Sequence, residues 1–249
     1  MISAAQIKYI KSLQQKKFRN QNREFLVEGV KMVSELLRCP SFEITQLWIQ
    51  ESVQPQFAQT DHGIVSQAEM ERITALASPS PALAVVKMQP DNTPLPAPKN
   101  LCLVLDGVKD PGNMGTVLRI ADWFGIEAIY ASEDCVELYN PKTVQATMGA
   151  LFRVPVHYTD IASLLATASL PVYGTVLEHG TDIYQMQLPQ EALLVMGSES
   201  HGISEALLPL LTHRLSIPSF RKGSESLNVA VATAVTCALF RQQAPKSTK

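Results

Sequence analysis

The sequence predicts an α/β protein of two domains, the second built on a mainly parallel sheet. Two observations carry this prediction. After residue 100, short apolar runs that resemble strands alternate with amphipathic segments that resemble helices, the order found in parallel sheets with helices on both faces. Residues 89–100 contain four prolines and predict a stiff linker between the domains. The boundaries expected are therefore 1–88, 89–100 and 101–249.

Residues 1–88 predict a small α/β domain. Apolar residues at helical spacing alternate with short β-type runs, and Ser66 with Glu69 three residues later forms a capping box that starts a helix. The expected elements are a helix over 3–17, a basic loop, a strand over 25–27, a helix over 29–37, strands over 44–49 and 63–65, a helix over 66–77 and a strand over 82–88.

Residues 101–125 organise the second domain. Five apolar residues predict a buried strand that ends at Asp106, and a glycine-bearing loop leads into a helix capped by Asn113 and ended by Gly125. The expected strands lie over 101–105, 127–131, 171–177, 193–196 and 213–217, and the expected helices over 114–124, 141–149, 203–211 and 227–241.

Three loops at the carboxyl ends of these strands contain polar residues and glycine: residues 106–115, 197–202 and 218–226. Ligands of parallel sheets bind at these ends, so the coincidence of three such loops predicts a site. The first loop by itself also fits an ordinary tight turn, and its spacing is not that of a dinucleotide fingerprint. Arg119, placed one and a half turns into an otherwise apolar helix, favours a site.

Composition and charge narrow the function classes. At 249 residues, 46% hydrophobic and 18% charged, the chain is typical of soluble globular proteins, and no apolar run reaches membrane-span length. The four cysteines are scattered and the five histidines lack metal spacing, so we expect a cytoplasmic protein without a metal or a signal peptide. The net charge of −2 hides a basic N-terminus, where residues 16–23 suit either RNA phosphates or a solvated helix face.

The last predicted helix is apolar or small on every side from Val229 to Phe240. A helix without a polar face is buried all round. We expect it to form a subunit interface, with a plain core position as the alternative.

Three segments of the second domain stand out as motifs: N-M-G-T-V-L-R at 113–119, L-V-M-G-S-E-S-H-G-I-S at 194–204, and L-S-I-P at 215–218 followed by E-S-L-N-V-A-V-A at 225–232. In order and spacing they resemble the motifs of the SpoU (TrmH-type) RNA 2′-O-ribose methyltransferases of the SPOUT superfamily. V-Q-A-T-M-G-A-L-F-R-V-P-V at 144–156 resembles the segment between the first two motifs. Residues 23–37 are similar to the ribosomal-protein-like substrate-binding domain of rRNA-directed members.

The resemblance implies a trefoil knot, S-adenosyl-L-methionine as cofactor, a homodimer, and an RNA substrate, with rRNA preferred to tRNA. By position, the cofactor would be held by Met196, Gly197, Ile217 and Leu227. The polar catalytic residues would be Asn113, Arg119, Glu199, Ser226 and Asn228.

One segment departs from the family pattern. Ser219 replaces the methionine of the usual I-P-M run, and Gly223 follows late, which puts the cofactor loop in question. The family mechanism makes the arginine a general base, but a guanidinium rarely gives up its proton. The alternative is that Arg119 holds a phosphate and aims the hydroxyl.

Two other function classes remain open at this point. The chain could be an RNA-binding ribosome-assembly factor that keeps the fold without turnover, although it retains polar residues in all three loops. A nucleotide-dependent dehydrogenase would need a fingerprint that the first loop lacks.

Overall fold

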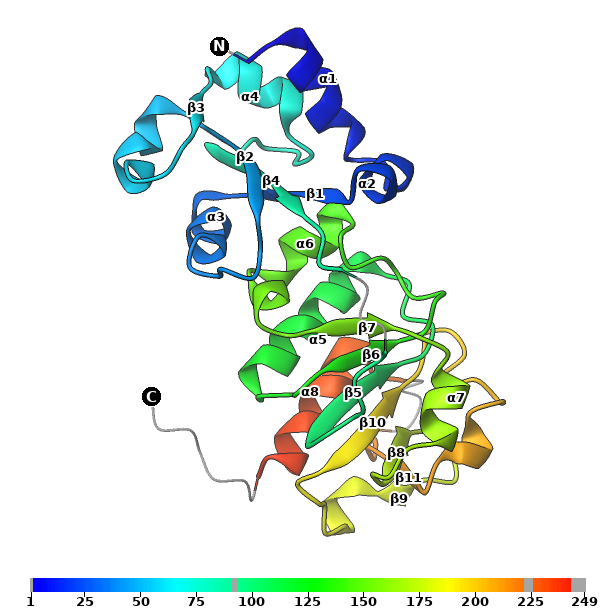
Figure 1. The fold of residues 1–249 in the computed structure, drawn as a ribbon. Coiled ribbons are helices and arrows are strands. Elements are labelled where there is room, and N and C mark those ends of the chain that lie inside the picture. Colours follow the sequence, from blue (N-terminus) through cyan, green and yellow to red (C-terminus); the bar gives the residue numbers. More distant parts are fainter. Residues whose placement is uncertain (1, 91–93, 222–225, 243–249) are drawn as a thin grey trace. The chain divides into compact units, whose positions relative to one another are not determined.

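The computed structural model describes residues 2–90, 94–221 and 226–242 (Figure 1). The chain forms two compact units. The first unit comprises Met1–Pro90 and Glu137–Phe152, and the second comprises Asp91–Val136 and Arg153–Lys249. Within the described ranges, no helix combines the length and apolar character needed to cross a bilayer.

The first unit contains a four-stranded sheet in the order β1-β4-β2-β3. β4 pairs antiparallel with β1 and β2, and β3 pairs parallel with β2. The strands are β1 (Glu24–Glu28), β2 (Ile44–Ile49), β3 (Gly63–Ile64) and β4 (Ala82–Lys87). The N-terminal helices are α1 (Ala4–Ser12), α2 (Lys16–Asn22), α3 (Val30–Leu36) and α4 (Gln67–Ile73), with a 3-10 helix η1 (Glu51–Phe57).

Two helices of this unit, α1 and α4, begin directly after a serine that caps them. The predicted box at Ser66 and Glu69 is present, and Ser3 with Gln6 forms a second one. The single helix expected over 3–17 is instead two, because α1 ends at Ser12. The segment expected as a basic loop folds as α2, which Arg23 ends in the left-handed conformation (φ 55°).

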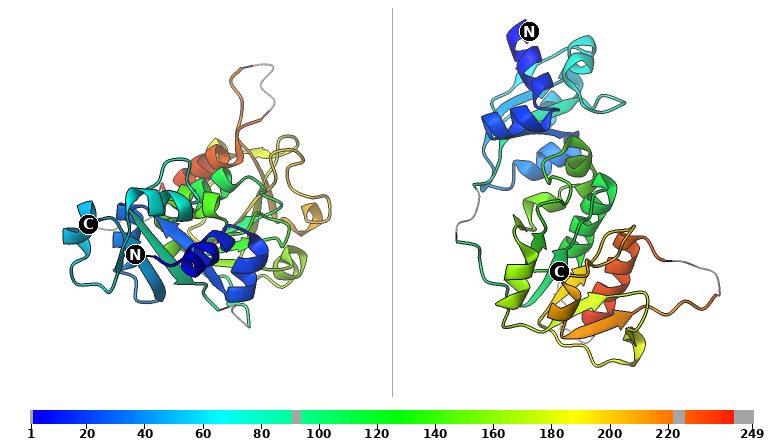
Figure 2. Two further views of the ribbon diagram at one scale, coloured as in Figure 1. Left: turned by 90° about the horizontal axis from the view of Figure 1, so that it is seen from above. Right: turned by 90° about the vertical axis from the view of Figure 1, so that its right-hand side faces the viewer.

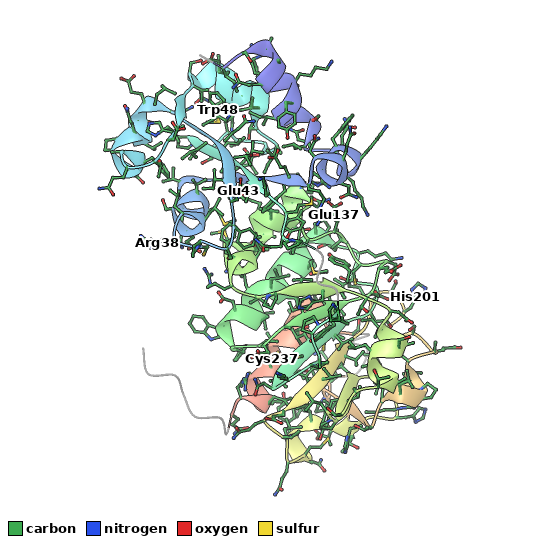
Figure 3. The ribbon with its side chains drawn as sticks, viewed as in Figure 1. Arg38, Glu43, Trp48, Glu137, His201 and Cys237 are labelled. Atoms are coloured by element: carbon green, nitrogen blue, oxygen red, sulfur yellow. The ribbon has the colours of Figure 1, made fainter. Side chains whose placement is uncertain are left out.

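The first unit also takes in a segment distant in sequence, which carries α6 (Pro141–Thr147) and the 3-10 helix η2 (Ala150–Phe152). Arg19, only 2% exposed, forms a bidentate ion pair at 2.8 and 2.9 Å with Glu137, which is labelled in Figure 3. The Tyr139 ring lies 4.4 Å from that of Phe25. The boundaries at 88 and 101 stay predictions, but the first compact unit is completed by residues from beyond the proline-rich segment.

The second unit is built on a seven-stranded sheet in the order β7-β6-β5-β10-β8-β11-β9, in which every pairing is parallel. This confirms the mainly parallel α/β class; the knot stays a prediction. The strands are β5 (Leu101–Leu105), β6 (Ile129–Ala131), β7 (Val156–Tyr158), β8 (Val172–Thr175), β9 (Thr181–Asp182), β10 (Ala192–Met196) and β11 (His213–Ser216).

Helices cover both faces of this sheet. α5 (Pro111–Trp123) and α8 (Val229–Phe240) pack together on one face, and α7 (Ile161–Ala166) lies on the other (Figures 1 and 2). Both faces of β5 are buried, as expected from its unbroken apolar run. Two 3-10 helices, η3 (Ile183–Gln185) and η4 (Leu208–Leu210), complete the unit.

The helix expected over 203–211 is wrong. That segment forms turns and the short η4, in which Pro209 lacks the N–H that a longer helix needs. Ile203 and Leu207 are instead buried with α7 in the apolar cluster on that face.

Candidate active site

Three loops of the second unit leave one edge of its sheet. Because the strands are parallel, the loops after β5, β10 and β11 start from the same edge. β6 and β7 lie on one side of β5, and β10, β8 and β11 on the other. The strand order therefore reverses between β5 and β10, the position where open parallel sheets bind ligands.

The first loop leads into α5 by way of an aspartate cap. The Asp110 carboxylate accepts the backbone N–H of Asn113 at 2.8 Å, and Pro111 is the first helical residue. The prediction that Asn113 caps this helix is therefore wrong. Proline at the first helical position has no N–H to satisfy, so the helix starts before the apolar pattern does. The Asn113 side chain is thus available for contacts outside the helix.

The second loop folds back on itself directly after β10. Ser198 and Gly202 exchange two backbone hydrogen bonds of 3.0 Å. A Cβ on Gly197 would lie 2.0 Å from the carbonyl carbon of Gly202, so this closure requires glycine. The backbone N–H of Ser204 donates to the Asp106 carboxylate at 2.7 Å and ties the loop to the end of β5.

The third loop ends at the N-terminus of α8. Asn228 caps this helix, its Oδ1 atom accepting the backbone N–H of Ala230 at 2.9 Å. Ser226 is exposed, and Leu227 exposes 48% of its surface. The predicted departure lies partly outside the described residues, which stop at Arg221 and resume at Ser226.

A chain of side-chain hydrogen bonds joins the three motifs. Asn228 Nδ2 donates to Asn113 Oδ1 at 2.9 Å, and Asn113 Nδ2 donates to Glu199 Oε1. The structure therefore brings together one predicted polar residue from each of the three segments. Glu199 is exposed and Asn113 is half-buried. In the same loop as Glu199, His201 (Figure 3) has its Nδ1 atom 2.8 Å from Ser200 Oγ.

Arg119 stands apart from this chain of hydrogen bonds. It lies on the exposed side of α5, and it forms no hydrogen bond or ion pair with the described residues. Its rise above Asn113 is about 9 Å along the helix axis, at 1.5 Å per residue. The guanidinium is thus presented to solvent with all its donors available.

The predicted cofactor residues surround the ends of β10 and β11. Gly197 and Met196 are buried, Ile217 is half-buried, and Leu227 is partly exposed. The Met196 carbonyl accepts the backbone N–H of Asp106 at 2.9 Å. Ile217 and Leu227 thus offer apolar surface beside the close-packed backbone of Gly197.

Sequence reasoning missed a group of residues that supports the first loop. The Gly107 N–H donates to Ser132 Oγ at 2.9 Å, and the Val108 N–H donates to Cys135 Sγ at 3.2 Å. Burial raises the pKa of the Cys135 thiol. The Ser132 hydroxyl, which donates to Asp134, lowers the pKa of that carboxyl. Gly107 has a positive φ (71°), consistent with its place just after the apolar run of β5, but nothing in the sequence pairs this turn with Ser132 or Cys135.

Among the described residues, no group of three or more His, Cys, Asp or Glu side chains could hold a metal ion. The acidic residues of the site instead accept hydrogen bonds from amides, as Asp106, Asp110 and Glu199 do.

Comparison with known proteins gives two family matches. Residues 100–238 match the model of the SpoU rRNA Methylase family, and residues 4–84 match an MRM3-like substrate binding domain.

Individual relatives match over more than nine-tenths of the chain. A 23S rRNA (guanosine(2553)-2′-O)-methyltransferase of Bacillus subtilis is 32% identical, over 92% of this chain and 93% of its own. A TrmH-family protein from Porphyromonas gingivalis superposes with a TM-score of 0.89 at 37% identity, covering 98% of this chain and all of its own. An AdoMet-bound rRNA methyltransferase from Sinorhizobium meliloti gives 0.85 at 26% identity, covering 99% and 98%.

Proposed function

The chain belongs to the SpoU rRNA methylase family, and we propose that it transfers a methyl group from S-adenosyl-L-methionine to a ribose 2′-hydroxyl of ribosomal RNA. The observation that carries this proposal is the hydrogen-bonded chain from Asn228 through Asn113 to Glu199 at the point where strand order reverses. A scaffold protein has no need to keep polar side chains of three distant segments in mutual register at a ligand-binding edge.

S-adenosyl-L-methionine supplies the methyl group. Gly197, Ile217 and Leu227 would hold it: the glycine through its close-packed backbone, and the other two through apolar surface. Met196 is 1% exposed, so its part is to support the loop from below. The AdoMet-bound state of the related Sinorhizobium enzyme supports this choice of cofactor.

Arg119 acts on the RNA. Its fork of donors matches a phosphate of the substrate backbone, and an exposed guanidinium without an internal partner is ready to receive one. Arg119 clamps the phosphate and so aims the neighbouring ribose hydroxyl. Ser226, exposed beside Leu227, offers a hydroxyl at the same edge.

The first unit binds the RNA substrate. The match of residues 4–84 to a substrate binding domain supports this assignment, as does the exposure of Lys8, Lys11, Lys16 and Lys17. Arg19 is excluded from the basic surface, because its guanidinium is buried against Glu137. Exposed lysines contact phosphates without reading sequence, so this surface sets affinity and its salt dependence.

The enzyme works as a homodimer in the cytoplasm, with α8 at the subunit interface. One side of α8 is buried within its own unit through Thr233, Thr236 and Cys237. Val231 exposes 49% of its surface on a helix without charged residues, which favours cover by a second copy of the chain.

The test of the function is methyl transfer from labelled S-adenosyl-L-methionine to total RNA, followed by mapping of 2′-O-methyl sites in cells with and without the gene. We expect a gene-dependent site in ribosomal RNA. A gene-dependent 2′-O-methyl site in tRNA alone would contradict the proposal that ribosomal RNA is the substrate. Cofactor binding without transfer to any RNA would favour the non-catalytic assembly factor.

A further inference from the structure

We infer that Glu199 accepts the proton of the ribose 2′-hydroxyl during methyl transfer, and that Asn113 and Asn228 hold its carboxylate in place for this step. The inference rests on the function proposed above and assigns a specific role to one residue of the same site. It places proton transfer on a carboxylate and leaves Arg119 the task of binding phosphate.

The orientation of both amides is fixed from the two ends of the chain of hydrogen bonds. At one end, Asn228 Oδ1 accepts backbone N–H groups of Ala230 and Val231 at 2.9 and 3.4 Å, so its Nδ2 must point away from α8. At the other end an ionised carboxylate only accepts, so Asn113 must turn its Nδ2 toward Glu199. With Asn228 Nδ2 donating to Asn113 Oδ1, every donor meets an acceptor.

In this arrangement one carboxylate oxygen of Glu199 accepts a hydrogen bond and the other accepts none from the described residues. Asn113 holds Glu199 through Oε1, and Oε2 has no hydrogen-bond partner among the described residues. Because the Glu199 side chain is exposed, Oε2 is open to a substrate hydroxyl. Without a partner, the long Glu199 side chain would sample many rotamers. The hydrogen bond from Asn113 restricts these rotamers and so keeps the carboxylate aligned for the reaction.

The other predicted polar residues are poorer proton acceptors. Both asparagine oxygens already accept hydrogen bonds within the site. The guanidinium of Arg119 carries only donors. Ser226 offers a neutral hydroxyl, which gains nothing electrostatically from a developing positive charge. Glu199 is the one of the five that combines negative charge with an unused acceptor atom.

The proton balance of the step is simple. As the 2′-oxygen forms its bond to the methyl group, the bond from that methyl group to the sulfonium sulfur breaks, and its electron pair stays on sulfur, so that neutral S-adenosyl-L-homocysteine is the leaving group. The 2′-oxygen gains positive charge in this displacement, and its O–H bond becomes acidic. That bond breaks and the proton passes to Glu199 Oε2, which leaves an uncharged carboxylic acid and a neutral ether. The acid then releases the proton to water and the carboxylate is restored. Late transfer of this kind needs an acceptor already within hydrogen-bond reach.

The experiment is single-turnover methylation of the RNA substrate at saturating cofactor by wild type, Glu199→Gln, Glu199→Ala and the control Glu205→Gln. Glu205 is an exposed carboxylate close in sequence and has no hydrogen bond among the described residues. We expect both Glu199 variants to lose about 100-fold or more in rate, the scale of general base catalysis, and the control to keep the wild-type rate. Formate should raise the rate of Glu199→Ala, whose missing carboxylate leaves room for it, and formamide should not.

Two readouts other than activity separate proton transfer from binding. Calorimetry with S-adenosyl-L-methionine and filter binding of RNA should give wild-type affinities for Glu199→Gln. In the Glu199→Gln background, adding Asn113→Ala should cost no further rate, because Asn113 acts through the carboxylate.

A wild-type rate for Glu199→Gln, or a rate loss matched by lost RNA or cofactor affinity, would overturn this inference while the proposed function stands. Failure of formate to rescue Glu199→Ala would also overturn it. Absence of methyl transfer by the wild type to any RNA would overturn the proposed function, and the inference with it.

Discussion

Asn228 donates a 2.9 Å hydrogen bond to Asn113, although 115 positions separate the two residues in the chain. Each residue belongs to the N-terminal turn of a helix, Asn113 to α5 and Asn228 to α8. The contact therefore fixes the start of one helix against the start of the other. A second contact joins the C-terminal ends of the same two helices. There the Arg241 guanidinium donates to the Phe124 and Gly125 carbonyls at 2.8 and 2.6 Å.

The first prediction tests this contact without removing the helix cap. Asn228→Asp keeps an oxygen that can cap α8 but replaces the amide that donates to Asn113. We expect kcat to fall roughly tenfold or more, the scale of the interaction energy between two side chains in direct contact. KM and the melting temperature should stay near wild type, because the helix cap is kept. Asn140→Asp, the same change at the cap of α6, is the matched control and should leave kcat unaffected. Unchanged kcat in Asn228→Asp would show that the contact has no catalytic role.

The second prediction concerns Arg119. Because a forked contact to phosphate cannot be copied by an ammonium group, Arg119→Lys should lose nearly as much rate as Arg119→Ala, roughly 100-fold or more. Cofactor affinity by calorimetry should be unchanged, since Arg119 lies outside the loops assigned to the cofactor. Arg214→Ala, an exposed arginine on β11, serves as control. Parallel loss of cofactor binding would indicate a structural role.

The third prediction compares two ion pairs of the first unit, both with a labelled glutamate in Figure 3. Glu137→Ala leaves the buried Arg19 charge without its partner and should lower the free energy of unfolding by about 3–5 kcal/mol. Glu43→Ala breaks the exposed pair with Lys87, in which both side chains are more than half exposed, and should cost at most about 1 kcal/mol. Urea unfolding followed by tryptophan fluorescence, to which the buried Trp48 contributes, measures both free energies, and equal costs would contradict the prediction.

The fourth prediction tests the subunit interface. Val231→Glu places a charge on the partly exposed side of α8 and should dissociate the homodimer without unfolding the unit. Sedimentation velocity at micromolar concentration measures the result. Leu177→Glu changes a more exposed leucine outside α8, at 73% exposure, and should leave the dimer intact. A wild-type protein that sediments as a monomer would contradict the proposed subunit interface.

The fifth prediction is a pH dependence of stability. Burial raises the pKa of Glu28, against the opposing hydrogen bonds from Thr74 and the Ala75 N–H. A carboxyl whose pKa is raised by folding contributes most while it is protonated, so stability should decline as pH rises from the ordinary value of 4.5 through the raised value. Glu28→Gln should flatten this part of the melting-temperature profile, and an unchanged slope would assign it to other groups.

Much of the second unit could be predicted from sequence. Strand β5 follows directly from an unbroken apolar run, and the three loops follow from glycine and polar residues at strand ends. Three-residue β7 and two-residue β9 are too short to produce a periodic signal, and both were missed. The cap of α5 was misplaced because Asp110 and Pro111 precede the apolar pattern.

Contacts between residues distant in the chain could not be predicted from the sequence. The three polar loops predicted a site, but the direction of the hydrogen bonds within it depends on which side chains face each other. Nothing in the basic segment distinguishes Arg19, which is buried, from the exposed lysines beside it. Its partner Glu137 lies 118 positions away, so the burial of this charge is a tertiary effect.

The return of residues 137–152 to the first unit has a consequence for synthesis of the chain. Residues 1–90 leave the ribosome first, and the 62 residues that follow up to position 152 (152 − 90) need roughly 3–12 s at the usual elongation rates. Until these partner residues are made, Arg19 has no Glu137, and Phe25 and Phe42 lack the rings of Tyr139 and Phe152. The N-terminal unit therefore cannot finish folding as a nascent chain until strands β5 and β6 have also emerged.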